Sequence, residues 1–436
     1  MIKKLVLVFV TIFTLQSNAQ ENTASPYSFY GIGSLKFKGT VENRSMGGLS
    51  IYTDSIHVNL RNPASYAGNN LELWGNESRP VKFTVGGSHS SIDLKSDTSE
   101  GSTSSTSFDY LAMNVPMGRF GFGFSLVPYT AVGYKLEDIN DNGDIASRFN
   151  GEGGVNKASI GFGYQVSKAL SVGIDANYNF GNIENSSITY RYDSDDIRLL
   201  NQSKESNRSD LSGLDINLGV SYKAMLTEKL EFVSGITFTP ESTLVSKNIR
   251  DLSTVVVSDS DSGSESVVNS ISVDLEALNL DETDLTIPSK FSFGAGIGAP
   301  RKWFVGAEYT TQKISEFSNP LYTNATTAYE DASTISIGGF YIPQYDSYTS
   351  YLKRVVYRAG IRQEKSGLNI NGESINEFGM SFGVGIPLSG GISNANLGFE
   401  IGKRGTTNSS LIQENFINLH ISLSLNDRWF EKKKYY

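Results

Sequence analysis

The sequence contains one segment with the spacing of a hydrolase nucleophile motif, the G-x-S-x-G pattern at Gly379–Gly383. A serine in this pattern is catalytic when it sits in a sharp turn between a strand and a helix. Here large apolar residues alternate with Gly and Ser from Phe378 to Ile386, which predicts an uninterrupted strand. His420 lies in a second alternating segment, where a hydrogen-bonded structural histidine is favoured over a triad with a Ser and an Asn from other strands. We expect no catalytic residues and no enzyme.

A second pattern with chemical meaning begins at Asp138 and matches the first half of a calcium-binding loop. The bidentate Glu expected at the twelfth position of such a loop is replaced by Phe149. Asp138, Asn140 and Asn142 are therefore weak calcium candidates in what we expect to be a solvated loop. The chain has three histidines and no cysteine, so we expect no transition-metal site and no cofactor.

Three arginines, Arg354, Arg358 and Arg362, follow one another at intervals of four residues. In a strand, side chains at this spacing lie on one face, about 13 Å apart. Because an arginine facing lipid at mid-membrane costs about 2–4 kcal/mol, this face should point inward in a membrane protein. Glu308 and Glu400 are expected on the same face of other strands. Salt bridges inside the protein are the favoured role, and guidance of an amphipathic solute is the alternative.

The composition identifies the class of protein that must position these residues. The 436 residues include 43 glycines, 11% are aromatic, and only 19% are charged, below the roughly 25% of ordinary soluble domains. The formal net charge is −9, so the chain has no basic surface for nucleic acid. Many glycines and aromatics, few charges and no cysteine indicate a secreted or outer-membrane β protein.

The N-terminus reads as an export signal. Two lysines precede an apolar stretch from Leu5 to Leu15, and Ser17-Asn18-Ala19 provides small residues before a cleavage site. The apolar stretch is too short to cross about 30 Å of hydrocarbon as a helix. We therefore assign residues 1–19 to a signal peptide and expect the mature protein outside the cytoplasm.

Strand periodicity repeats from residue 81 to the C-terminus and predicts a transmembrane barrel over residues 80–428. Long segments alternate apolar residues with Gly, Ser and Asn, as in Leu170–Phe180 and Ile417–Leu425. The boundaries that we expect give an all-β, 14-stranded antiparallel barrel, with strands at 81–95, 107–116, 119–135, 154–166, 169–183, 209–224, 229–246, 287–299, 302–313, 332–345, 352–364, 375–388, 394–404 and 415–426. Short links alternate with long polar loops such as 184–208 and 247–286, which places both termini in the periplasm of a Gram-negative bacterium.

Residues 20–79 precede the first strand and lack sustained periodicity. A barrel of this size has a lumen wider than its own side chains fill, so we predict that this segment folds inside as a plug, or hatch. A disordered leader is the alternative, which the aromatic residues in this segment disfavour. Residues 429–436 are expected to form a basic periplasmic tail.

Several short motifs, in their order along the chain, resemble the FadL-type outer-membrane channels. Arg44–Gly48, Asp54 and Asn62-Pro63-Ala64 resemble the hatch of that family; Leu126–Tyr129, Ile287–Phe291 and Trp303–Tyr309 resemble its strands. The resemblance implies a plugged barrel that passes hydrophobic or amphipathic molecules. It gives the candidate hatch residues Gly47, Gly48, Asp54, Asn62, Pro63 and Ala64.

The resemblance leads to two functional hypotheses. The first is passive uptake of small hydrophobic or amphipathic compounds through the plugged barrel, with outer-membrane lipid and a small hydrophobic solute as partners. The family's transporters have apolar outer loops, whereas residues 251–284 here hold nine acids and no Lys or Arg. The second hypothesis is therefore a non-catalytic barrel subunit of a multi-protein outer-membrane complex for protein secretion or outer-membrane protein assembly, with other outer-membrane or periplasmic proteins as partners.

Overall fold

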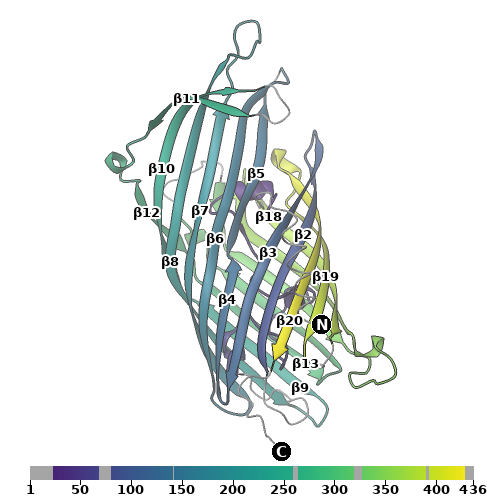
Figure 1. Ribbon diagram of the computed structural model, residues 1–436. Coiled ribbons are helices and arrows are strands. Elements are labelled where there is room, and N and C mark those ends of the chain that lie inside the picture. The colour runs from purple at the N-terminus through teal and green to yellow at the C-terminus, as the bar shows by residue number, and fades with distance from the viewer. Residues whose placement is uncertain are drawn as a thin grey trace, which may run out of the picture.

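A computed structural model describes residues 23–67, 80–140, 142–258, 264–318, 327–388 and 392–427 (Figure 1). The predicted signal peptide and basic tail lie outside these residues. The fold is nearly all sheet, and none of the helices in the described ranges combines the length and apolar character needed to cross a membrane. The helices are short: η1 (Pro26–Phe29), α2 (Val41–Arg44), η2 (Pro63–Ala67), η4 (Glu276–Leu278), η5 (Ile314–Glu316), η6 (Leu352–Arg354) and η7 (Asn408–Ser410).

The strands form a closed, 14-stranded antiparallel barrel, as predicted. Three positions in the wall are each occupied by two consecutive strands, and β20 pairs with β2 to close the barrel. In order around the wall, the positions are β2 (Val81–Lys95), β3 (Glu100–Met117), β4 (Phe120–Pro128) with β5 (Thr130–Ile139), β6 (Ile145–Gln165), β7 (Leu170–Thr189), β8 (Asn201–Met225), β9 (Glu231–Thr239) with β10 (Ser242–Val257), β13 (Lys290–Ala299) with β12 (Glu282–Ile287), β14 (Trp303–Gln312), β16 (Ala332–Tyr341), β17 (Val356–Ile370), β18 (Glu373–Pro387), β19 (Asn394–Arg404) and β20 (Gln413–Asp427).

The outer surface of the barrel carries an apolar belt that accounts for the alternating sequence. On β20, Leu419 and Ile421 are 45% and 42% exposed, whereas Ser422, on the inner face, is fully buried. On β7, the stacked rings of Tyr178 and Phe180 mark the end of the outward apolar run. An outward apolar belt with an inward polar face is the pattern of a strand that crosses a membrane.

The register of β20 can be checked with single cysteines in this cysteine-free chain. Cysteine at Leu419 or Ile421 should react with a lipid-soluble maleimide, and cysteine at Ser422 should not, because the side chain of Ser422 points inward. The measurement is labelling in intact membranes. The reverse pattern would mean a register shifted by one residue, which moves every side chain to the other face.

Several strands continue well beyond the belt and correct the predicted loops. Parts of segments 184–208 and 247–286, expected as loops, instead extend β7, β8 and β10, and β10 pairs with the additional strand β11 (Glu265–Ser272); residues 190–200 and 273–281 remain loops between these strands. The cause is a buried apolar cluster of Ile188, Tyr190, Val255 and Val257, which joins these polar-looking strands on one side. The teal strands therefore rise above the rest of the wall in Figure 1. We call this end the long-strand end and the opposite end the short-turn end.

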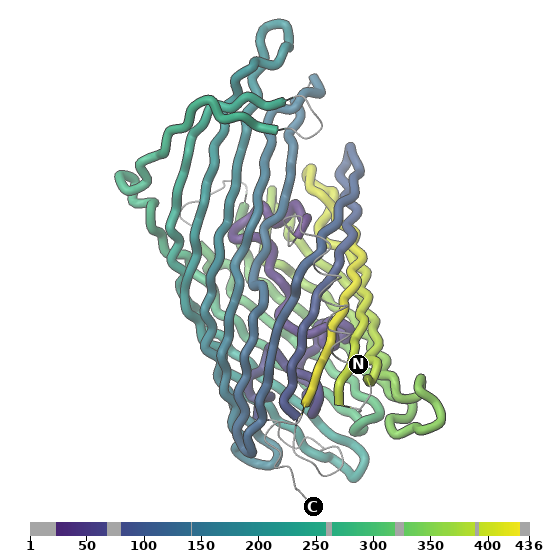
Figure 2. Tube along the Cα trace, in the orientation of Figure 1, coloured from purple at the N-terminus to yellow at the C-terminus, as the bar shows by residue number. Residues whose placement is uncertain are grey.

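The described part of the N-terminal region, residues 23–67, runs inside the barrel; we call it the inner segment. Figure 2 shows its purple tube within the ring of strands. Its apolar side chains pack against inward side chains of the wall, for example Val41 with Tyr110 and Ala112, and Leu49 with Phe304. Short strand β1 (Ser34–Leu35) pairs with β5.

The wall has one stretch where neighbouring strands do not pair. β3 pairs with β4 only from Leu111 to Met117. Beyond Pro128 the chain continues as β5, whose described partners are β6 and β1. The half of β3 from Glu100 to Tyr110 therefore has no ladder partner on this side among the described strands.

Candidate functional site inside the barrel

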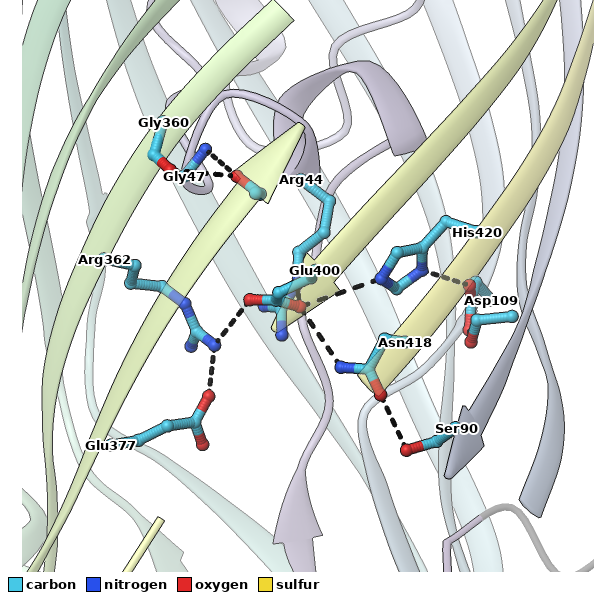
Figure 3. Close-up of polar contacts among 12 residues, drawn as sticks. Arg44, Gly47, Ser90, Asp109, Gly360, Arg362, Glu377, Glu400, Asn418 and His420 are labelled. Carbon is cyan, nitrogen blue, oxygen red and sulfur yellow. Dashed lines mark hydrogen bonds and ion pairs between the residues drawn. The ribbon is translucent and has the colours of Figure 1, made fainter. Parts of the chain in front are cut away.

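The inner segment is held to the wall by buried ion pairs and close backbone contacts. α2 begins after Thr40, whose backbone N–H donates to Asn43 Oδ1, and it ends at Arg44. The Arg44 guanidinium then donates from Nε to Glu400 Oε2 of β19 at 2.7 Å. Figure 3 shows Arg44 reaching across to Glu400 from the inner segment. One end of a short helix is thus joined electrostatically to the wall.

Glu400 is the centre of a polar network whose members lie on β17, β18, β19, β20, β2 and β3 (Figure 3). Its other oxygen accepts from Arg362 Nη2 at 3.2 Å, and Oε2 also accepts from Asn418 Nδ2 at 3.2 Å. His420 Nε2 lies 3.7 Å from Glu400 Oε2, and its Nδ1 lies 3.7 Å from Asp109 Oδ2. Glu400 is 2% exposed, so its charge is compensated by these neighbours rather than by water.

The network continues through Arg362 towards the long-strand end. Arg362 donates to Glu377 of β18, and Arg404 Nε donates to the second oxygen of Glu377 at 2.6 Å. Arg404 is also 3.9 Å from Glu414, which in turn accepts from the inner segment's Ser25. Alternating positive and negative side chains therefore follow the inner faces of β17 to β20, as ion pairing in a buried site requires.

A second ion pair holds the inner segment to a different part of the wall, at β14. Arg61 Nη2 lies 2.8 Å from Glu308 Oε1 of β14 and donates to Thr310 Oγ1 at 3.0 Å. The other oxygen of Glu308 accepts from the Ser50 backbone N–H at 2.9 Å. Glu308 was predicted on the same face as Arg358 and Arg362; in the structure its ion partner is instead Arg61.

The candidate hatch residues lie against glycines of the wall. Gly47, with φ of 71°, donates its N–H to Ser381 Oγ of β18 at 2.8 Å, and a Cβ there would lie 2.5 Å from Ile361 O. Gly48 has φ of 90° and lies beside Ser336 and Arg362. Both positions need glycine, for conformation and for space. Ser381 belongs to the G-x-S-x-G pattern, and its place in mid-strand with Gly47 and Gly360 as partners agrees with the predicted strand.

Asn62-Pro63-Ala64 forms a turn that bonds to the wall. Asn62 Nδ2 donates to Val220 O of β8 at 2.9 Å, while its Oδ1 accepts from the Ala64 N–H at 3.0 Å. Gly173 and Gly219 face this turn, and a Cβ on Gly173 would lie 2.6 Å from Pro63 O. The turn therefore sits where two neighbouring strands carry no side chain.

Other inward glycines extend this contact along the inner segment. A Cβ on Gly121 or Gly163 would meet the backbone around Tyr66 and Ala67, and one on Gly338 or Gly360 would overlap the backbone of Met46. The small inward residues that the sequence suggested for a confined lumen are thus, at these positions, the contact surface for the inner segment.

Asp54 lies near the short-turn end of the inner segment. It accepts from the backbone N–H groups of Ile56 and His57, and its Oδ2 lies 2.6 Å from His57 Nδ1. Burial opposes ionisation, but the charge and hydrogen bonds of His57, together with Lys82, hold the pKa of Asp54 below its usual value. Lys82 Nζ donates to the carbonyl oxygens of Asp54 and His57 and so ties this turn to β2.

The predicted ladder of three arginines is only partly correct. Arg358 and Arg362 are buried on the inner face of β17, where Arg358 Nη1 donates to Asn396 Oδ1 at 3.2 Å. Arg354 lies in η6, before β17 begins at Val356, and its guanidinium is over the ring of Tyr351. The prediction that Arg354 belongs to the strand is wrong, because the short turn η6 occupies residues 352–354.

The calcium candidates lie at the tip of the β5–β6 hairpin. Asn140 Oδ1 accepts from the N–H groups of Asn142 and Asp144, which closes the turn. Asp138 pairs with Ser147 across the hairpin. No group of three His, Cys, Asp or Glu side chains in the described ranges is placed to bind a metal ion.

Two cavities lie on either side of the inner segment. The polar chamber, about 240 Å³, borders the unpaired half of β3; its lining combines apolar residues with serines and charged residues that include Lys36, Ser88, Ser105, Asp109, Arg362 and His420. The basic pocket, about 600 Å³, opens at the short-turn end and includes Asp54, Arg354 and Arg358 in its lining.

Sequence reasoning missed Asp109, Glu377 and Arg404 of the network, and Arg61 of the second ion pair. Asp109 lies at a bulge, since the β2–β3 register shifts between Gly86 and Gly87. The bulge interrupts the alternation of inward and outward side chains, which was the pattern used to predict inward residues. Glu377 and Arg404 do follow the alternation. Charged residues at inward positions near the strand ends were a usable signal for these two.

Comparison with solved structures identifies the same fold in hydrocarbon transporters. The toluene transporter TodX of Pseudomonas putida aligns with a TM-score of 0.58 and 14% identity, covering 91% of this chain and 100% of its own. The toluene transporter TbuX of Ralstonia pickettii gives 0.56 and 15%, covering 89% and 98%. A FadL homologue of Pseudomonas aeruginosa gives 0.56 and 11%, covering 90% and 99%. At these identities the likeness establishes the FadL-type fold.

The comparison of sequences adds a family. No curated protein matches the chain. A family model described as BamG matches residues 1–436, the whole sequence. The chain therefore belongs to the BamG family and has a FadL-type barrel.

Proposed function

We propose that this protein is a plugged outer-membrane barrel that acts as a non-catalytic subunit of a multi-protein outer-membrane complex. The short-turn end, where β2 begins and β20 ends, faces the periplasm, and the long-strand end faces outward. Short turns on the periplasmic side and long extensions outside are typical of outer-membrane barrels. Residues 20–79 are the plug, of which the inner segment is the described part.

The observation that carries this proposal is the polarity of the route through the barrel. The polar chamber, which borders the unpaired half of β3, has charged and hydroxyl side chains such as Ser88, Ser105 and Asp109 along its lining, interspersed with apolar ones. A hydrocarbon entering there would displace the hydration of serines and ion pairs without making comparable contacts in return, which is unfavourable. Arg44 and Arg61, which also line the chamber, hold the plug to two separate strands of the wall, β19 and β14.

The extensions at the long-strand end agree with a role in assembly. β11 is an edge strand with its side chains exposed, including Val267 at 62% and Ile271 at 64%. Exposed apolar edge strands pair readily with other chains. Membership of the BamG family is compatible with a subunit of such a complex.

Passive uptake of small hydrophobic or amphipathic compounds is the second candidate function. The specific observation in its favour is the missing pairing between β3 and β5, because the unpaired half of β3 borders the polar chamber. The structural likeness to the toluene transporters TodX and TbuX is also compatible with uptake. The polar lining makes an amphipathic solute the better fit than a hydrocarbon.

Purification from native membranes in a mild detergent separates the two functions. A complex subunit should elute with a constant set of partner proteins in fixed ratio, at a size well above 47.6 kDa. The partners should remain after a high-salt wash and dissociate when the complex is denatured. A monomeric barrel that carries a bound hydrophobic compound would contradict the proposal and support uptake.

A further inference from the structure

The basic pocket has a charge opposite to that of the chain as a whole. Three acids line it, Glu42, Asp54 and Glu231. Twice as many cations line it: Lys82, Lys168, Lys223, Arg301, Arg354 and Arg358. The whole sequence has 37 Lys and Arg against 46 Asp and Glu. A local excess of positive charge in an acidic protein attracts anions to this site.

Two hydrogen-bond donors in the lining lack acceptors. The atoms Arg354 Nε and Asn394 Nδ2 are both buried and have no hydrogen-bond partner among the described residues; two acceptors of the same lining, Glu42 Oε2 and Glu231 Oε1, are unpartnered as well. A buried donor without an acceptor costs free energy, so such groups usually mark a place where a further molecule binds. The two donors suit a ligand that supplies carboxylate oxygens, and the two acceptors suit one that also supplies N–H groups, as a peptide does.

Part of the remaining lining is apolar and aromatic. Tyr52 and Phe340 contact each other with ring centroids 4.8 Å apart, and Ile56, Met225 and Ile342 lie around the same cavity. At about 600 Å³ the cavity is within the range of about 300–1,000 Å³ typical of ligand sites. The site therefore suits a ligand that presents both carboxylates and apolar side chains, and inorganic phosphate would leave the apolar half unused.

The location of the pocket narrows the choice of ligand. It lies within the ring of short turns, with Lys168 and Pro300 of separate turns and Pro387 at the end of β18 in its lining. Lipid acyl chains contact the outer belt of the barrel, from which the wall separates this cavity. A polypeptide that approaches from the periplasm can reach it directly.

We propose that the basic pocket binds an acidic peptide segment of a periplasmic protein, with carboxylates on Arg354 and its neighbours and apolar side chains against Tyr52 and Phe340. This inference rests on the proposed function, since it names the kind of partner bound at the periplasmic end of the same barrel. The pocket is the site that selects the partner by charge.

The test uses the full-length protein in lipid nanodiscs and a short fluorescein-labelled peptide that alternates Asp with Leu and Phe. Fluorescence polarisation should show binding that weakens as NaCl rises, because salt screens exposed charges. Arg301→Gln with Arg354→Gln should weaken binding by about tenfold or more, as expected for lost charged hydrogen bonds. Arg119→Gln is the matched control, because Arg119 is exposed on another turn at the same end and does not line the pocket.

Three results would overturn the inference. The first is that a peptide with Asn in place of Asp binds as tightly as the acidic peptide. The second is that Arg119→Gln weakens binding as much as the pocket substitutions do. The third is that decanoate binds tightly while the acidic peptide does not bind, which would make this a site for small amphiphiles. Co-purification of the unmodified protein is measured in parallel. If partners co-purify but the acidic peptide does not bind, the inference fails and the proposed function stands; a solitary barrel contradicts the proposed function whatever the peptide does.

Discussion

Replacing Arg44 and Arg61 together with glutamate should yield a barrel that inserts into membranes and conducts small polar solutes. Each substitution places a second carboxylate against a buried one, Glu400 or Glu308. Removing one partner of a buried pair already costs about 3–5 kcal/mol, and a like charge adds repulsion. The barrel strands pair without either arginine, so the free-energy loss falls on the contact between plug and wall.

The measurement is single-channel conductance in planar bilayers, together with sensitivity of cells to bulky antibiotics. Deletion of residues 21–75 provides the reference for an unplugged barrel. Arg119→Glu with Lys302→Glu is the matched control, because it makes the same change in net charge at exposed residues on turns. A double variant that stays folded in unheated SDS and is as impermeable as the unmodified protein would contradict the proposal that the inner segment closes the lumen.

Much of the barrel could be predicted because membrane strands repeat a simple rule. An outward side chain meets lipid and an inward one does not, so apolar alternation in segments such as Leu170–Phe180 gave their register directly. The rule stops at the end of the belt. Above it, Ser, Asn and charged residues face water on the outer side, and residues 201–210 lacked the pattern although they form the first part of β8.

The contacts inside the barrel depend on which strands become neighbours, and alternation carries no such information. Glu308 was correctly placed inward, but its pairing with Arg61 depends on the path of a segment without periodicity. Arg354 shared the spacing of Arg358 and Arg362, yet the turn η6 removed it from the strand. Spacing predicts a shared face only while the secondary structure is continuous.

The charged residues inside this barrel also show why its fold alone does not determine its function. The FadL-type fold is shared with hydrocarbon transporters at 14–15% identity, and a wall of this shape can enclose an apolar path or a network of ion pairs. Here Glu400, Arg362, Glu377 and Arg404 occupy the inner faces of adjacent strands. Function therefore has to be argued from these side chains rather than from the barrel.

Substituting leucine for Gly173 should displace the plug without unfolding the barrel. Gly173 has ordinary strand geometry and faces the turn at Asn62-Pro63-Ala64, where a Cβ would lie 2.6 Å from Pro63 O and overlap the Ala64 N–H. Residues with larger side chains are more favourable in strands than glycine is, so the pairing of β7 with its neighbours should be retained. Overpacking of a well-packed site costs about 1–3 kcal/mol. At Gly173 the new side chain meets backbone atoms, which cannot rotate away, so we expect a cost near the upper limit of this range.

Hydrogen exchange of residues 60–67, measured by mass spectrometry, should rise in Gly173→Leu while exchange in β7 and β8 stays low. Conductance should rise in parallel. Gly101→Leu is the matched control, since Gly101 also lies in a strand but has no heavy atom within 4 Å of the place that a Cβ would take. Unchanged exchange in residues 60–67 of a folded Gly173→Leu protein would mean that the turn does not press against this part of the wall. The inward glycines would then need another explanation than contact with the plug.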